Sequence, residues 1–81
     1  MKGKKMKTTK ERIRELREDS DLLQKDIAEL LGTTQQVYSR YENGINEIPV
    51  CHLITLSRFY KVSVDYIVGE TDYKGRYPES K

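Results

Sequence analysis

Two short segments with apolar residues at helical spacing, separated by a glycine, constrain this chain more than any other feature. Residues 23–31 carry apolar side chains with the period of a helix, and Gly32 follows them. Glycine readily takes the left-handed conformation that ends a helix. A second helix is expected from about Thr34 to Asn43, because Asn43-Gly44 is the next stop signal. Helices joined by so short an interval cross steeply, which is the helix-turn-helix arrangement.

The residues around this turn give two further expectations. Thr33 precedes Gln36 by three positions, the spacing of a capping box, so we expect Thr33 to cap the second helix. The helix over residues 23–31 is expected to bury one side, formed by Ile27, Ala28, Leu30 and Leu31.

Three more helices are predicted around this pair. The first begins with a capping box between Thr8 and Glu11, buries Ile13 and Leu16, and is broken at residues 19–21. Its outward residues are expected to be Arg12, Glu15 and Glu18. Pro49 allows a helix through Tyr60 with an apolar face of Leu53, Ile54, Leu56 and Phe59. Ser63 is expected to cap a short last helix that turns Val64, Ile67 and Val68 inward and ends at Gly69.

These elements predict an all-α fold of five helices in one small domain, which is all that 81 residues allow. Residues 1–7 are expected to be a flexible basic arm, residues 8–69 the folded domain, and residues 70–81 a loose polar tail. The net charge of +2 decides little, but residues 1–18 hold eight Lys/Arg against three Glu, which gives +5. A basic end suits a phosphate backbone, although a solvated tail explains the same lysines.

Several classes of function have little support. One cysteine cannot form an intramolecular disulfide, and Cys51 beside His52 does not have the spacing of a metal site. We expect no cofactor, no membrane span and a reducing cytoplasmic compartment. A small enzyme would have to use Cys51 and His52, which as helix neighbours should not face each other.

The helix after Gly32 has two different faces. Helical spacing puts Tyr38, Tyr41 and Glu42 on one side. The other side gathers bidentate hydrogen-bonding groups, which pair with adenine (Gln) and guanine (Arg) in the major groove. Candidates for base contacts are therefore Gln35, Gln36, Ser39 and Arg40, with Thr34 offering a methyl group to thymine. An ordinary solvated face remains the alternative.

Residues 22–44, LLQKDIAELLGTTQQVYSRYENG, resemble the helix-turn-helix of the Cro/cI-type (Xre) repressors. The resemblance extends to Ile48-Pro49, to Leu53 and Leu56, and to residues 62–65, so that it covers about residues 9–69. It implies a fold like that of the lambda repressor and binding to double-stranded DNA as a homodimer. Departures from the family pattern are Leu23 at a cap position, Tyr38 where a smaller aliphatic residue is common, and Ser57 in place of a frequent alanine.

The resemblance also assigns roles to residues outside the recognition helix. It implies that Gln24 and Asn43 bind phosphates and that Arg17 pairs with Glu42 in a partly buried salt bridge. Asn46 stands in a loop like that of the lambda repressor and is expected to reach a base edge. Lysines of the arm would neutralise phosphates, namely Lys2, Lys4, Lys5 and Lys7.

Together these features predict a transcriptional regulator, a repressor, that binds a pseudo-palindromic operator. The dimer surface is expected on the last two helices, with an exposed Tyr66 or the tail residues Tyr73 and Tyr77 contributing. A protein-interaction module that holds a partner through residues 70–81 is the alternative.

Overall fold

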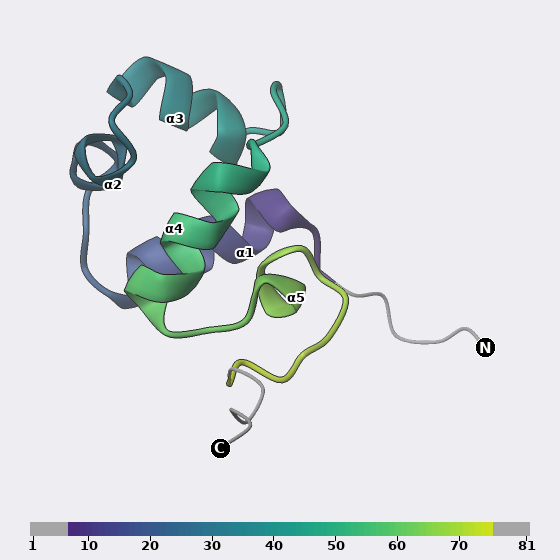
Figure 1. Cartoon of the computed structure of the whole chain (residues 1–81). Helices are drawn as coiled ribbons and strands as arrows, with labels where there is room; N and C mark the ends of the chain where they lie inside the picture. The colour runs from purple at the N-terminus through teal and green to yellow at the C-terminus, as the bar shows by residue number, and fades with distance from the viewer. Residues whose placement is uncertain (1–6, 76–81) are drawn as a thin grey trace.

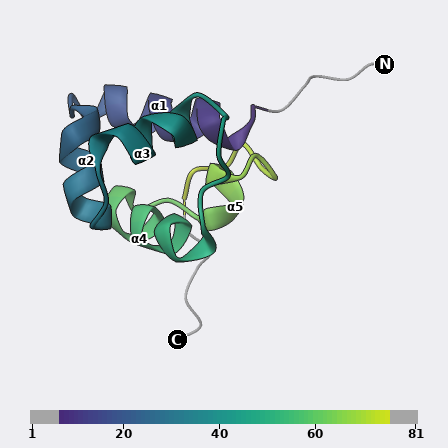
Figure 2. The ribbon, with the colours of Figure 1, turned by 90° about the horizontal axis from the view of Figure 1, so that it is seen from above.

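The computed structural model describes residues 7–75, which form five helices joined by short turns and loops (Figure 1). They are α1 (Thr9–Asp19), α2 (Gln24–Leu31), α3 (Gln35–Glu42), α4 (Val50–Tyr60) and α5 (Val64–Ile67). No strand occurs among these residues, and the all-α prediction is confirmed. Seen from above, α1 and α3 lie on one side, α4 and α5 lie on the other, and α2 closes one end (Figure 2). No helix in residues 7–75 has the length and apolar character that crossing a membrane requires.

The α2–α3 turn forms as the sequence predicts, except for its cap. Gly32 has a φ of +73° and ends α2, and the Thr33 N–H donates to the Ala28 carbonyl at 2.9 Å. The predicted cap at Thr33 is wrong by one residue. Thr33 belongs to the turn itself, so the next hydroxyl, that of Thr34, accepts the Val37 N–H at 3.1 Å.

The first and last helices begin as predicted. Glu11 Oε1 accepts the Thr8 N–H at 2.9 Å, which is the half of a capping box that the glutamate supplies. Ser63 Oγ accepts the Tyr66 N–H at 3.0 Å at the start of α5. These bonds satisfy N–H groups that a helix leaves free at its first turn.

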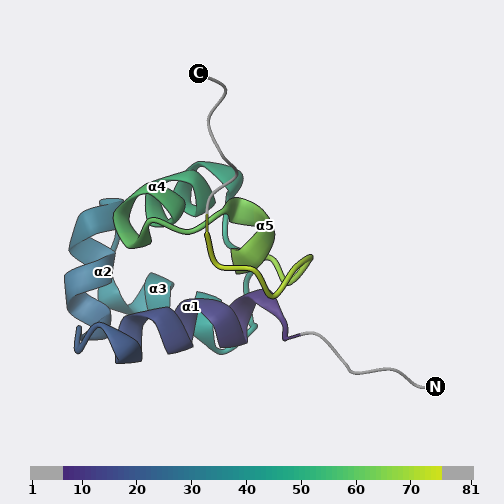
Figure 3. The same cartoon turned by 90° about the horizontal axis from the view of Figure 1, so that it is seen from below.

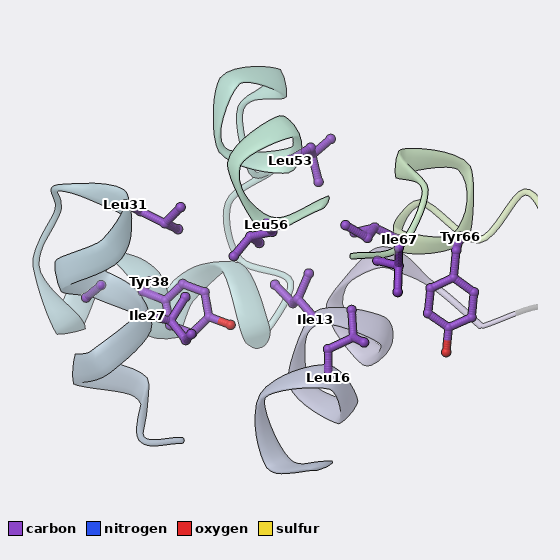
Figure 4. Packing of buried hydrophobic residues seen from close by; sticks show 11 residues of the cluster. Ile13, Leu16, Ile27, Leu31, Tyr38, Leu53, Leu56, Tyr66 and Ile67 are labelled. Atoms are coloured by element: carbon purple, nitrogen blue, oxygen red, sulfur yellow. The ribbon is translucent and has the colours of Figure 1, made fainter. Parts of the chain in front are cut away.

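The core draws side chains from all five helices (Figure 4). Its larger members are Ile13 and Leu16 from α1, Ile27 and Leu31 from α2, Tyr38 from α3, Leu53 and Leu56 from α4, and Tyr66 and Ile67 from α5. Three apolar residues that we expected inside are exposed, namely Leu30 (39%), Ile54 (41%) and Phe59 (45%). Their helical spacing turns them away from the buried line of α2 and α4, and none of the five helices in residues 7–75 covers them.

Tyr38 is the largest fully buried side chain of this core. Its side chain is fully buried and lies beside Ile27 in Figure 4. No residue within 7–75 meets hydrogen-bond geometry with its hydroxyl. Burial raises the pKa of Tyr38, and the neighbouring Glu42 raises it further, so the hydroxyl stays neutral. The ring also packs edge-to-face against Tyr41, with centroids 6.3 Å apart.

Arg12 is buried, contrary to the expectation that it points outward. Only 2% of the residue is exposed, and its guanidinium carbon lies 3.9 Å from the centre of the Tyr66 ring. Arg12 Nη1 also donates to the Tyr66 carbonyl at 3.2 Å. Tyr66 is therefore only 8% exposed, and the expectation that it is free for a dimer contact is wrong. Stacking of the cation on the ring lets both side chains leave solvent together.

Residues 70–75, which we call the strap, are held against the domain. Arg12 Nη2 forms an ion pair with Asp72 Oδ1 at 2.6 Å, and Nη1 donates to the Thr71 carbonyl at 3.3 Å. Further along, the Ser63 N–H donates to the Lys74 carbonyl at 3.2 Å. Figure 3 shows the strap in yellow between α5 and the beginning of α1. The expectation of a loose tail is thus wrong for these residues, and Tyr77 lies outside the described part of the chain.

Candidate nucleic-acid interface

The exposed side of α3 forms a shallow concave surface with the start of α2 and the loop after α3. We call it the α3 concavity, and it is lined by Gln24, Gln35, Gln36, Ser39, Arg40, Asn43 and Ile45. Six of these seven residues are candidates from the sequence, four for base contacts and two for phosphate contacts. The structure brings all six together on one surface.

The polar groups of the α3 concavity point to hydrogen bonding with a large ligand. Gln35 and Gln36 occupy the first turn of α3 and are exposed, and Arg40 is exposed one turn further on. Asn43 Nδ2 donates to Ser39 Oγ at 3.4 Å, so these two side chains lie along the same side of the helix. The N-terminal end of a recognition helix is the end that usually meets base edges.

Two candidates for base contacts do not line this surface. Thr34 stands at the N-cap, where its hydroxyl is bonded to the Val37 N–H. Asn46 lies beyond the end of α3 and lines a different hollow, with Tyr41, Ile48 and Leu53. Its backbone N–H donates to the Arg40 carbonyl at 3.3 Å, which fixes the loop against the last turn of α3.

A buried ion pair holds the C-terminal end of α3. Arg17 Nε lies 2.7 Å from Glu42 Oε2, and Arg17 Nη2 donates to Glu42 Oε1 at 3.0 Å, which makes the pair bidentate. Gln24 Nε2 donates to the same Oε1 at 3.0 Å. Burial alone would raise the pKa of Glu42, but hydrogen bonds, first that from Arg17, outweigh it and lower the pKa. One carboxylate thus joins α1, the start of α2 and the end of α3.

The lysines of the arm are less informative. Lys7 is engaged in an exposed ion pair with Glu15 on α1. The other three candidates for phosphate contacts, Lys2, Lys4 and Lys5, lie outside the described residues.

Sequence reasoning missed two features of this surface. Ile45 is 67% exposed in the middle of otherwise polar neighbours, and nothing in the apolar periodicity singles it out because it lies in a loop. Gln24 was considered only as a phosphate ligand, although it also bonds Glu42. The contact joins residues 18 positions apart, so no local pattern reveals it.

The only thiol of the chain lies elsewhere, on α4. Cys51 Sγ is 3.8 Å from His52 Nδ1, so the expectation that these side chains do not face each other is wrong. His52 in turn contacts the Tyr41 ring, with centroids 6.1 Å apart. Within residues 7–75 no three His, Cys, Asp or Glu side chains gather in a way that would hold a metal ion.

Comparison with known proteins agrees with this geometry. A model of the helix-turn-helix family matches residues 13–67. The uncharacterized HTH-type transcriptional regulator YobD of Bacillus subtilis is 40% identical over 62 residues, which are 76% of this chain and 55% of that protein. The HTH-type transcriptional regulator ImmR of the same organism is 33% identical over 61 residues, 75% of this chain and 48% of that protein.

A solved structure is also similar. The crystal structure of a transcriptional regulator from Listeria innocua aligns with a TM-score of 0.74 at 27% identity, covering 76% of this chain and 58% of that one. The chain spans about half of the length of the relatives it matches. From the matched residues 13–67 and the helix-turn-helix seen in the structure, the chain belongs to the Cro/cI-type (Xre) family of helix-turn-helix transcriptional regulators.

Proposed function

We propose that this chain binds a specific site on double-stranded DNA and thereby regulates transcription, with α3 as the recognition helix. The α3 concavity carries the proposal, since it offers two glutamine amides and one guanidinium on an exposed helix face. Such groups pair bidentately with adenine and guanine edges in the major groove. Gln24 and Asn43, both near the C-terminal end of α3, are suited to phosphate contacts that set the register.

Tertiary contacts fix the position of α3, and this supports the proposal that it recognises bases. Specific pairing requires donors and acceptors that are already in position, because ordering them on binding costs free energy. Tyr38 anchors the middle of α3 in the core, and the bonds from Arg17 and Gln24 to Glu42 hold its end. The exposed side chains are therefore presented on a backbone that does not have to be ordered by DNA.

We further propose that two copies bind together on a pseudo-palindromic operator and act as a repressor. One helix contacts only a few base pairs, so a second copy, on a half-site about one helical turn away, is needed for selectivity. The outward side of α4 is the surface we favour for dimerisation, because Val50 and Ile54, four residues apart on that helix, are both exposed. An operator that overlaps a promoter is blocked by occupancy alone, which makes repression the simplest outcome.

Selection of bound duplexes from a random pool at about 0.15 M salt tests the proposal. We expect enrichment of an inverted repeat, and no enrichment with the Gln36→Ala/Arg40→Ala variant. Enrichment of a single half-site would support α3 as the recognition helix and contradict binding as a dimer. Salt-sensitive binding without any enriched sequence would reject specific recognition.

That last result would favour a protein-interaction module. One observation favours this second candidate, since the strap holds its backbone against the domain while leaving the Tyr73 ring 62% exposed. Specific DNA binding that appears only when a partner protein is added, and is lost in Tyr73→Ala, would establish it.

A further inference from the structure

A second, smaller hollow adjoins the α3 concavity on the side of α1. We call it the α1 concavity, and it is lined by Lys10, Glu11, Arg14, Glu42 and Asn43. Asn43 lines both surfaces, so the two are continuous at the C-terminal end of α3. Lys10 and Arg14 are four residues apart on α1, which puts both cations on the same side of that helix.

Lys10 reaches this place because Gly44 has no side chain. A Cβ on Gly44 would lie 2.8 Å from Lys10 Cδ and 3.3 Å from Nζ, so the lysine stem passes directly over the glycine. Gly44 also has a φ of +75°, which other residues rarely adopt. The Lys10 ammonium thus lies near the carbonyl end of α3, where the helix dipole favours a positive charge.

The carboxylates of the α1 concavity are already engaged, whereas its cations are available. Glu42 is bonded to Arg17, and Glu11 accepts the Thr8 N–H at the start of α1. Within residues 7–75 Arg14 has one ion pair, with Glu18 at 3.7 Å, and both side chains are more than half exposed, so this pair is weak. Lys10 has no ion pair within 4 Å among residues 7–75.

We propose that Lys10 and Arg14 form a binding site for a phosphodiester of the DNA backbone, next to the base-contacting surface of α3. The proposal rests on the proposed function and extends it, because neither residue was a candidate from the sequence. A guanidinium and an ammonium suit phosphate oxygens, and such contacts fix the register of the recognition helix without selecting bases. Asn43, which lines both hollows, would stand where the backbone contacts give way to the base contacts.

The salt dependence of DNA binding measures the number of phosphate contacts, and so tests the roles of Lys10 and Arg14. Each lost phosphate contact reduces the steepness of log K against log salt by about 0.9, so on a duplex with a single half-site Lys10→Ala and Arg14→Ala should each reduce it by about 0.9 and the double variant by about 1.8. Lys74→Ala removes the same charge from the strap, which lines neither concavity, and should leave the slope nearly unchanged. The ratio of affinities for the preferred and a scrambled duplex should be preserved in all four variants.

A second variant connects the effect to the observed geometry. Gly44→Ala should lower the salt slope in the wild-type background, because the new Cβ displaces Lys10, and should not lower it further in Lys10→Ala. Circular dichroism of each variant at the binding temperature verifies that it is folded. A Gly44→Ala effect of equal size in both backgrounds would overturn the role of Lys10.

The two proposals fail in different ways. If wild type discriminates between duplexes while Lys10→Ala/Arg14→Ala keeps the wild-type salt slope, the phosphate site is wrong and DNA recognition stands. If wild type shows no sequence preference, the proposed function itself is wrong. Duplexes with one neutral methylphosphonate at a time identify the phosphate, since its neutralisation should weaken wild type and leave the double variant unaffected.

Discussion

Glu42 shows how one side chain can determine the position of a recognition helix from its buried side. It receives Arg17 from α1 and Gln24 from α2 while itself forming the last residue of α3. A bidentate pair of this kind fixes geometry even where its net stabilisation is modest, because desolvation offsets much of the attraction. Removing one partner is costly, since the other charge is left without compensation.

Glu42→Gln should lower the free energy of unfolding at pH 7 toward the lower end of about 3–5 kcal/mol, since Arg17 retains some solvent contact. The folded pKa of Glu42 is below the ordinary value of about 4.3, so the carboxylate stabilises the fold above that pH. Its contribution is lost as the pH falls from about 4.3 through the lowered folded pKa. Urea unfolding at pH 7, 5, 4 and 3 should therefore show the gap between wild type and variant narrowing below about pH 4.

Glu29→Gln is the matched control, since Glu29 is exposed on α2 and the same change of charge should leave stability almost unaltered. A gap between wild type and Glu42→Gln that stayed constant down to pH 3 would contradict the assigned pKa direction.

On the exposed side of α3, Arg40→Ala or Gln36→Ala should each cost about 1–3 kcal/mol on the preferred duplex and relax specificity at one base position. The reason is the loss of a bidentate contact to a base edge. Arg40→Lys keeps the charge without the planar fork, so it should retain affinity for random duplex while losing base preference. Competition binding with single-base operator variants measures both effects, and a uniform loss on every sequence would argue against base contact.

At the scale of the element, α3 depends on its surroundings for its stability. Eight residues are too few for an isolated helix to be stable in water. Its beginning is capped by Thr34, its middle is packed through Tyr38 and its end is bonded through Glu42. The direction of the recognition helix is thus a property of the tertiary structure.

Thr34→Ala should destabilise the domain by about 1 kcal/mol, because the Val37 N–H loses its acceptor. Thr33→Ala, one residue earlier, is the natural control and should change stability much less. Denaturant unfolding compares the two, and equal losses would contradict the observed cap.

The helices themselves were predictable because their signals are local. Gly32 after α2 and Ser63 before α5 act within a few residues, and the structure reproduces both, although apolar spacing put Leu30, Ile54 and Phe59 on the buried side. The exposed side of α3 follows from the same spacing. By contrast, the burial of Arg12 depends on Asp72, sixty positions away, and no local pattern encodes such a contact.

At the scale of the whole molecule, the strap joins the two ends of the described chain. Arg12, near the beginning, is bonded to Thr71 and Asp72 near the end, and Ser63 binds the Lys74 carbonyl. The guanidinium therefore has acceptors inside the fold that a domain ending at residue 69 would lack. The length of the stable unit is set by this contact as well as by the helices.

A chain shortened to residue 69 should be less stable than one shortened to residue 75 by about 3 kcal/mol, because Arg12 loses Asp72 and the Thr71 carbonyl while its contacts with Tyr66 remain. Introducing Arg12→Met in both should remove most of that difference, because no buried charge then remains. Urea unfolding of the four proteins forms a double-mutant cycle. Equal stability of the two shortened chains with Arg12 intact would show that the strap contributes nothing.

Cys51 offers a single exposed thiol for site-specific labelling. It is the single cysteine of the chain, is exposed on the first turn of α4, and lines neither the α3 nor the α1 concavity. A maleimide dye will therefore attach at one defined place without mutagenesis and without covering the surface proposed for DNA. Because α4 is also the proposed dimer surface, self-association should shield Cys51 from the dye. The rate of labelling should therefore fall as the concentration of the unmodified protein rises.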